Sequence, residues 1–148
     1  MSTTAAIQSQ KFTLDDIAIT GPSIRTFFCV LLFILASGFQ HDCHSYLASL
    51  KPKGPPSGQS KPSEYKLPDH PAFHYLIAPH YFAECLIYVS LTIIAAPKGS
   101  WVNMTLGCAL VFVLVNLGAT ADVTRVWYRQ RFGEEGVRGK WRMIPWMY

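Results

Sequence analysis

Residues 76–96 read LIAPHYFAECLIYVSLTIIAA, a run that is long and apolar enough to cross a membrane, yet it contains one acidic residue, Glu84. A carboxylate inside a bilayer is costly, so we expect Glu84 to be paired, protonated or turned toward a polar cavity, and to be functional. Pro79 is typical of a first helical turn, and His80 adds a titratable group one turn before Glu84. The run predicts a membrane helix that carries a polar site.

Two further apolar runs flank this one. They are residues 24–39 (IRTFFCVLLFILASGF), extendable through Leu47, and residues 101–121 (WVNMTLGCALVFVLVNLGATA). Half of the 148 residues are hydrophobic and only 15% are charged, less than is usual for a soluble domain. We therefore predict an all-α integral membrane helical bundle with about three transmembrane helices.

The net charge of +4 is unevenly distributed along the chain. The loop between the second and third runs contains Lys98 as its one basic residue, whereas basic residues gather after the first run (Lys51, Lys53, Lys61 and Lys66) and after the third (Arg125, Arg129, Arg131, Arg138, Lys140 and Arg142). Three crossings put both groups on one side, which the positive-inside rule makes cytosolic, with the N-terminus in the lumen or outside. Anchoring to anionic lipid also explains most of these cations.

The chain divides into a polar N-terminal segment, residues 1–23, and a helical domain, residues 24–148. The N-terminal segment lacks the basic start of a secretory signal, and Thr13–Asp16 could begin a short helix. Residues 51–63 (KPKGPPSGQSKPS) are typical of a mobile loop. The four cysteines are scattered through the apolar runs, so we interpret them mostly as small core residues: Cys29, Cys43, Cys85 and Cys108.

Polar residues near the helix ends allow several interpretations. His41, Cys43 and His44 could bind zinc, but the second ligand pair that zinc sites usually use does not follow, and the same side chains could simply cap the helix. Asn116 could bond another helix or face Glu84 and orient a ligand. The Gly-x-Gly-x-x-Gly fingerprint of dinucleotide binding is absent. Instead, the basic and aromatic residues on the predicted cytosolic side could cradle phosphates, although lipid-facing loops have the same composition.

Five blocks of sequence, in order, carry a family resemblance. They are QxxCHxxLxxLK at 40–51, YKLP at 65–68, APHYxAExxxYVS at 78–90, WYxxxF at 127–132 and KxxMIPW at 140–146. Their order and spacing resemble the C-terminal domain of the steroid 5-alpha-reductase family, and most closely its polyprenol (polyprenal) reductase branch. The resemblance covers about residues 24–148.

The resemblance implies a function as well as a fold. Family members are seven-helix membrane oxidoreductases that use NADPH on the cytosolic side. They add hydride to the β-carbon of an α,β-unsaturated carbonyl while an acid polarises the carbonyl oxygen. For the polyprenol branch this implies a polyprenyl lipid substrate, whose α-isoprene unit is reduced in the endoplasmic reticulum membrane for dolichol biosynthesis and protein N-glycosylation. The expected partners are this lipid and the membrane, and no nucleic acid.

The resemblance also implies which residues lie at the cofactor. Lys51 and Lys66 stand where the family has arginines, which keeps the charge but weakens bidentate contact, and His80 replaces a frequent asparagine near the nicotinamide. Glu84 matches a family glutamate that organises the cofactor pocket. The full set of cofactor-side positions is Gln40, His44, Lys51, Tyr65, Lys66, His80, Glu84, Asn116, Tyr128 and Lys140. No metal ligand and no catalytic residue is assigned.

Two other classes remain open from the sequence. A membrane methyltransferase that uses S-adenosylmethionine carries adjacent glutamates after an arginine, which RFGEE at 131–135 resembles, although the surrounding spacing differs. A non-enzymatic membrane subunit or remnant of an enzyme is the second. Binding of S-adenosylmethionine rather than NADPH would indicate the first.

Family members carry about four further helices before the matching region, and these supply the Tyr and Glu that polarise the carbonyl. We therefore predict that the 148 residues alone, expressed in microsomes, do not reduce polyprenal with NADPH. The consumption of polyprenal would be measured by chromatography, with a full-length relative as the positive control. Full activity of the short chain would contradict the claim that the preceding helices supply essential chemistry.

Overall fold

The computed structural model describes residues 21–51 and 65–147. Most of the polar N-terminal segment, with the helix start expected at Thr13–Asp16, and nearly all of the expected loop at 51–63 lie outside these ranges. The described residues form the helices α2 (Ile24–Ser49), α3 (Pro71–Tyr75), α4 (Pro79–Ile94) and α5 (Met104–Phe132), followed by the 3₁₀ turn η2 (Glu134–Gly136). Within them an isolated bridge is the one β-pairing, which confirms the all-α class.

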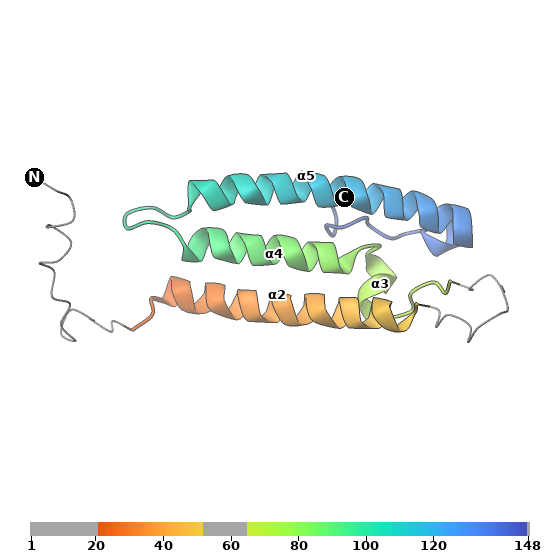
Figure 1. The fold of residues 1–148 in the computed structure, drawn as a ribbon, viewed down its shortest axis with the longest axis horizontal. Helices are drawn as coiled ribbons and strands as arrows, with labels where there is room; N and C mark the ends of the chain where they lie inside the picture. Colours follow the sequence, from red (N-terminus) through yellow and green to blue (C-terminus); the bar gives the residue numbers. More distant parts are fainter. Residues whose placement is uncertain (1–20, 52–64, 148) are drawn as a thin grey trace, which may run out of the picture.

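The three long helices lie side by side in one layer, with α4 between α2 and α5 (Figure 1). Helices α2 and α5 run in the same direction and α4 runs opposite to them. The short helix α3 lies at the end of the layer where α2 stops and α4 starts. This order follows the chain, because each long helix packs on the next one.

Small buried residues at heptad spacing form the contact between α2 and α4. The buried residues of α2 are Cys29, Ala36 and Cys43, each seven positions after the last. Ala83 and Ser90 of α4 are also fully buried and seven apart. A seven-residue repeat keeps one stripe facing a neighbour that crosses at a small angle, and small side chains let the two backbones approach closely.

A second seam on α4 faces α5. Cys85 and Thr92 are buried and again seven residues apart. Cys85 belongs to one apolar cluster with Val113 and Ala121 of α5. Thr92 reaches Gly107, where a Cβ atom would lie 4.0 Å from its methyl group. Helix α4 is therefore held on both sides by short side chains.

The helices confirm the membrane prediction in length and composition. Helices α2 and α5 are long and apolar enough to cross a bilayer, and only 11% and 17% of their most apolar stretches are buried in the bundle, unlike a soluble core helix. Helix α4 has 16 residues and spans about 24 Å, short of the roughly 30 Å hydrocarbon core. Helix α5 continues to Phe132, beyond the expected end of the run at residue 121.

The second run is not helical along its whole length, because its first residues pair with the C-terminal tail. Leu76 forms a parallel bridge with Trp141, and the backbone N–H of Ile77 donates to the Trp141 carbonyl at 2.9 Å. The helix begins only at Pro79, which occupies its first turn as the sequence predicts. A backbone pairing between distant segments thus replaces one turn of the expected helix.

The tail itself folds back onto the bundle after α5. Gly133 ends the helix with a φ of +82°, a conformation that favours glycine and lets the chain reverse. Met143 is 1% exposed inside the apolar cluster of α4 and α5, and Arg142 forms an ion pair with Asp122 of α5. The tail is therefore part of the folded domain.

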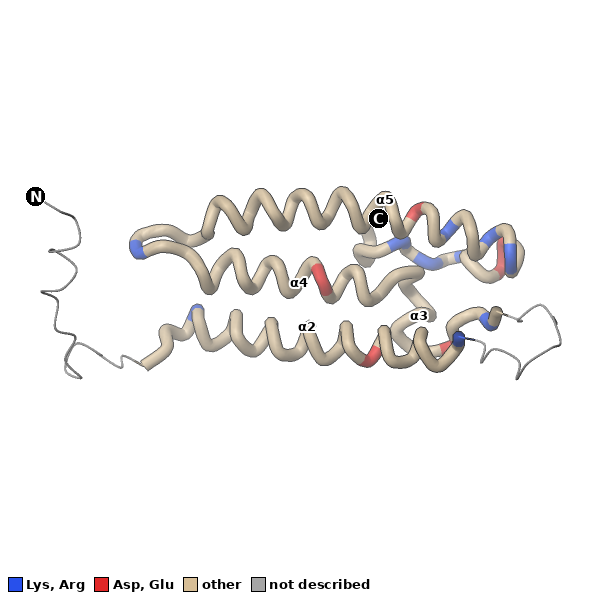
Figure 2. The backbone as a smooth tube through the Cα atoms, in the orientation of Figure 1, with Lys and Arg blue, Asp and Glu red and all other residues tan. Residues whose placement is uncertain are grey.

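Basic residues gather at the end of the layer where α2 and α5 stop (Figure 2). Among the described residues, Arg25 and Lys98 are the cations at the opposite end, in the first turn of α2 and in the turn after α4. This asymmetry agrees with the charge pattern on which the expected orientation rests.

The buried tail predicts a difference between two methionines. Met143→Ala removes a side chain from the core and should lower the free energy of unfolding by about 2–4 kcal/mol. Met147→Ala is the control, because Met147 is 82% exposed, and should change it by less than about 0.5 kcal/mol. Both can be measured by thermal unfolding in detergent. Equal effects would show that the tail is not anchored through Met143.

Candidate functional site

Glu84 lies on one side of the helical layer, between the two seams of α4. Its neighbours Ala83 and Cys85 face α2 and α5, and residue 84 is about 100° from each around the helix. The side chain is half-buried and its Oε2 accepts a hydrogen bond from Gln40 Nε2 of α2 at 3.3 Å. The costly carboxylate therefore has a polar partner on the neighbouring helix.

One turn closer to the basic end, two histidines repeat this pairing. His44 follows Gln40 by four residues and His80 precedes Glu84 by four, so antiparallel helices bring them together. Their rings meet edge to face with centroids 4.9 Å apart. The Nδ1 atom of His80 is buried and has no hydrogen-bond partner in the described part of the chain. An unpaired buried nitrogen is a group that a bound polar ligand can satisfy.

The same stripe of α2 continues into a cavity of about 230 Å³. Its lining combines two lysines and two tyrosines with apolar side chains: Leu47, Leu50, Lys51, Tyr65, Lys66, Pro68, Trp127 and Tyr128. Residues 40, 44, 47 and 51 follow one face of α2, so the Gln40–Glu84 pair, the two histidines and this cavity lie along one line. We call this line the polar track.

Aromatic residues close the cavity against α5. Tyr65 packs edge to face on Trp127 with centroids 5.6 Å apart. The phenol of Tyr128 lies close enough to those of Tyr81 and Tyr46 to interact electrostatically with them. Tyr81 in turn packs on His80, with ring centroids 4.3 Å apart.

The structure thus brings eight of the ten expected cofactor-side residues onto the polar track: Gln40, His44, Lys51, Tyr65, Lys66, His80, Glu84 and Tyr128. Lys140 lies in the tail, near Asp69. Burial lowers the pKa of the Lys140 ammonium group, and Asp69 opposes that shift. Asn116 occupies an exposed position of α5, whose buried face is formed by Val113, Gly118 and Ala121, so it is not brought to Glu84.

The zinc interpretation receives no geometric support from the described residues. Cys43 is fully buried against α4, whereas His41 and His44 are exposed on the same helix. The described residues contain no group of three or more His, Cys, Asp or Glu side chains that could hold a metal ion.

Several residues of this region were missed by sequence reasoning. Asp42 and Tyr46 of α2 contact the segment that carries Tyr65 and Lys66, through His70 and Asp69. The four-residue spacing of Asp42 and Tyr46 indicates that they share one face of α2. Their partners come from a distant segment that no local pattern identifies.

A larger cavity of about 420 Å³ is separate from the polar track. Phe82 lines it and is about 200° from Glu84 around α4, which places it on the other side of the layer. Its lining is aromatic and apolar, with Phe39, Tyr75, Trp141 and Trp146 among the residues, and contains no charged side chain. This cavity suits an apolar ligand rather than phosphates.

Together these features define a helical membrane domain with a polar site on one side. The protein-family model described as 3-oxo-5-alpha-steroid 4-dehydrogenase matches residues 6–148. The chain belongs to this family.

Relatives of known name agree with that assignment. Polyprenal reductase 2 of Oryza sativa subsp. indica is 30% identical over 118 residues, which cover 79% of this chain and 30% of the relative. Polyprenal reductase of Xenopus tropicalis is 30% identical over 117 residues, 79% of this chain and 36% of the relative. A very-long-chain enoyl-CoA reductase of Dictyostelium discoideum is 25% identical over 126 residues, 85% of this chain and 38% of the relative. The chain therefore spans about a third of these relatives. No solved structure gives a significant match.

Proposed function

We propose that this chain forms the cofactor-binding part of an NADPH-dependent reductase that saturates the α-isoprene double bond of polyprenal in the endoplasmic reticulum membrane. The product would serve dolichol biosynthesis and protein N-glycosylation. The observation that carries the proposal is the polar track, which runs from the Gln40–Glu84 pair to a cavity with two lysines. Relatives named polyprenal reductase support the choice of substrate.

The chemistry of the cavity fits a dinucleotide phosphate. Lys51 and Lys66 would hold phosphate groups as point charges, without the bidentate geometry of arginine. The faces of Tyr65 and Tyr128 would support an aromatic base. The unpaired Nδ1 of His80, farther along the track, would bond a polar group of the nicotinamide end. When bound, NADPH supplies the hydride.

The deeper residues would orient the ligand rather than react with it. The Gln40 amide donates to one oxygen of Glu84 and fixes that carboxylate toward the track. The other carboxyl oxygen of Glu84 can then accept a hydrogen bond from an amide or hydroxyl of the cofactor. We assign no residue of this chain to polarise the substrate carbonyl, because the resemblance places that role in preceding helices.

The same proposal accounts for substrate and orientation. A polyprenyl chain is as apolar as the exposed faces of α2 and α5, so it would reach the site from the bilayer. The basic end of the layer would face the cytosol, with its NADPH. The enoyl-CoA reductase relative supports reduction of a carbon–carbon double bond as the general reaction.

The methyltransferase alternative gains nothing from its RFGEE segment. Glu134 pairs with Arg129 Nε at 3.7 Å where α5 ends, and Glu135 is exposed beside it in η2. These glutamates lie just after the end of α5 and do not line the cavity of the polar track.

Replacing the central carboxylate tests the cofactor proposal. Glu84→Ala should raise the Kd for NADPH by about tenfold or more, because it removes a hydrogen-bond acceptor and leaves the Gln40 amide unpaired. Titration of nicotinamide fluorescence with the purified chain in nanodiscs would measure it. In an intact relative the same change should weaken NADPH binding more than it alters substrate choice.

Glu135→Ala is the matched control, since Glu135 is exposed and does not line the cavity of the polar track. It should leave the affinity unchanged. Unaltered NADPH binding by a folded Glu84→Ala variant would refute the role of Glu84 in the cofactor pocket.

A further inference from the structure

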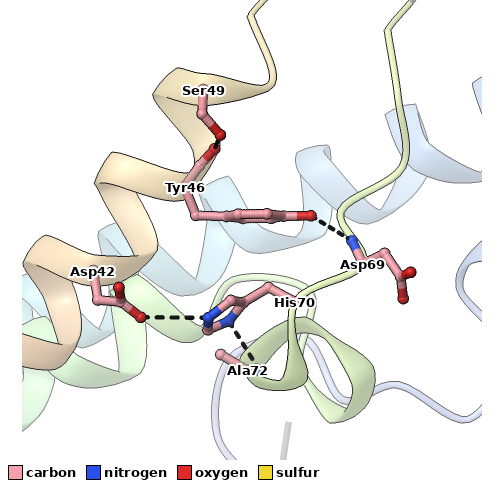
Figure 3. Close-up of polar contacts among 6 residues, drawn as sticks. All are labelled: Asp42, Tyr46, Ser49, Asp69, His70 and Ala72. Carbon is pink, nitrogen blue, oxygen red and sulfur yellow. Dashed lines mark hydrogen bonds and ion pairs between the residues drawn. The ribbon is translucent and has the colours of Figure 1, made fainter.

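Tyr65 and Lys66 line the cavity from residues 65–70, which form no helix or strand. A segment without its own hydrogen-bonded ladder is held in place by its neighbours and opens easily when those contacts are few. The position of Lys66 therefore depends on what binds the residues after it. Two contacts from α2 do so, and both are visible in Figure 3.

The first contact is made by Tyr46. Its hydroxyl oxygen accepts a hydrogen bond from the backbone N–H of Asp69 at 2.8 Å. The Tyr46 ring packs on His70 and Phe73, with centroids 5.1 and 5.8 Å apart. Since Phe73 is 1% exposed, the phenol has a rigid support. This bond fixes the backbone three residues after Lys66.

The second contact joins Asp42 to His70. His70 Nε2 lies 3.4 Å from Asp42 Oδ2, while its Nδ1 accepts a hydrogen bond from the backbone N–H of Ala72 at 3.3 Å. The Nε2 atom of the ring is thus directed at the Asp42 carboxylate (Figure 3). His70 thereby caps α3 and ties that helix to α2.

These residues do not line the cavity, so any effect on its contents is indirect. Asp42 and Tyr46 are one turn apart on α2, in the same half of the helix that supplies Leu47, Leu50 and Lys51 to the cavity wall. We propose that Tyr46 and the Asp42–His70 pair are positioning residues that hold the segment 65–70 on α2, so that Lys66 and Tyr65 meet the cofactor. This inference rests on the proposed cofactor site.

The test begins with Tyr46→Phe, which removes the hydroxyl and keeps the ring. It should raise the Kd for NADPH about threefold to tenfold, with unchanged thermal stability of the chain in nanodiscs. Ser49→Ala is the control, because Ser49 Oγ donates to the Tyr46 carbonyl at 2.6 Å within the same helix and does not touch the segment. It should leave the Kd unchanged.

A double-mutant cycle separates positioning from a general structural role. In a Lys66→Ala background, Tyr46→Phe should change the Kd less than it does in the wild-type chain, because one of the two residues through which it acts is gone. An undiminished effect in that background would overturn the proposal.

Hydrogen exchange supplies a readout that needs no cofactor. Tyr46→Phe should speed amide exchange in the peptide containing Asp69, while exchange in α5 stays the same. Unchanged exchange at Asp69 would overturn the positioning role. A wild-type chain that bound no NADPH would instead refute the proposed function, and the exchange result would still decide the positioning role.

Discussion

The structure depends on the way α4 is held from both sides by small residues. Ala83 and Ser90 form one seam and Cys85 and Thr92 the other, so α2 and α5 must lie on opposite sides of α4. Close backbone approach at these seams allows little rotation of the helix. The side chain of Glu84 therefore lies between the two seams, on one side of the helical layer.

This constraint explains how separate residues become a site. Antiparallel packing at the first seam brings Gln40 to Glu84 and His44 to His80, each pair one turn from the other. The stripe of α2 then leads to the lysines at the basic end, where the tail and the segment 65–70 close the structure. The tail contributes by pairing Trp141 with Leu76, which fixes where α4 begins.

Periodicity and composition were sufficient for the three long helices and for the start of α4 at Pro79, whereas the functional role of Glu84 stays a prediction. The partner of Glu84 was not predictable from local pattern, because it requires the register between two helices, although the seven-residue spacing of Cys29, Ala36 and Cys43 was available as a guide. The strand-like pairing of Leu76 with Trp141 joins residues too far apart in sequence for any window to detect. The exposed position of Asn116 was not predictable either, because a lone polar residue in an apolar helix does not indicate which way it faces.

The central claim is that the polar track and its two lysines bind a dinucleotide that carries an extra phosphate. Comparing the Kd of the purified chain in nanodiscs for NADPH and for NADH tests it most directly. We expect NADPH to bind more tightly by about tenfold, and we expect this difference to shrink as salt is raised, because Lys51 and Lys66 are exposed. Equal affinity for the two cofactors, or no saturable binding of either, would contradict it.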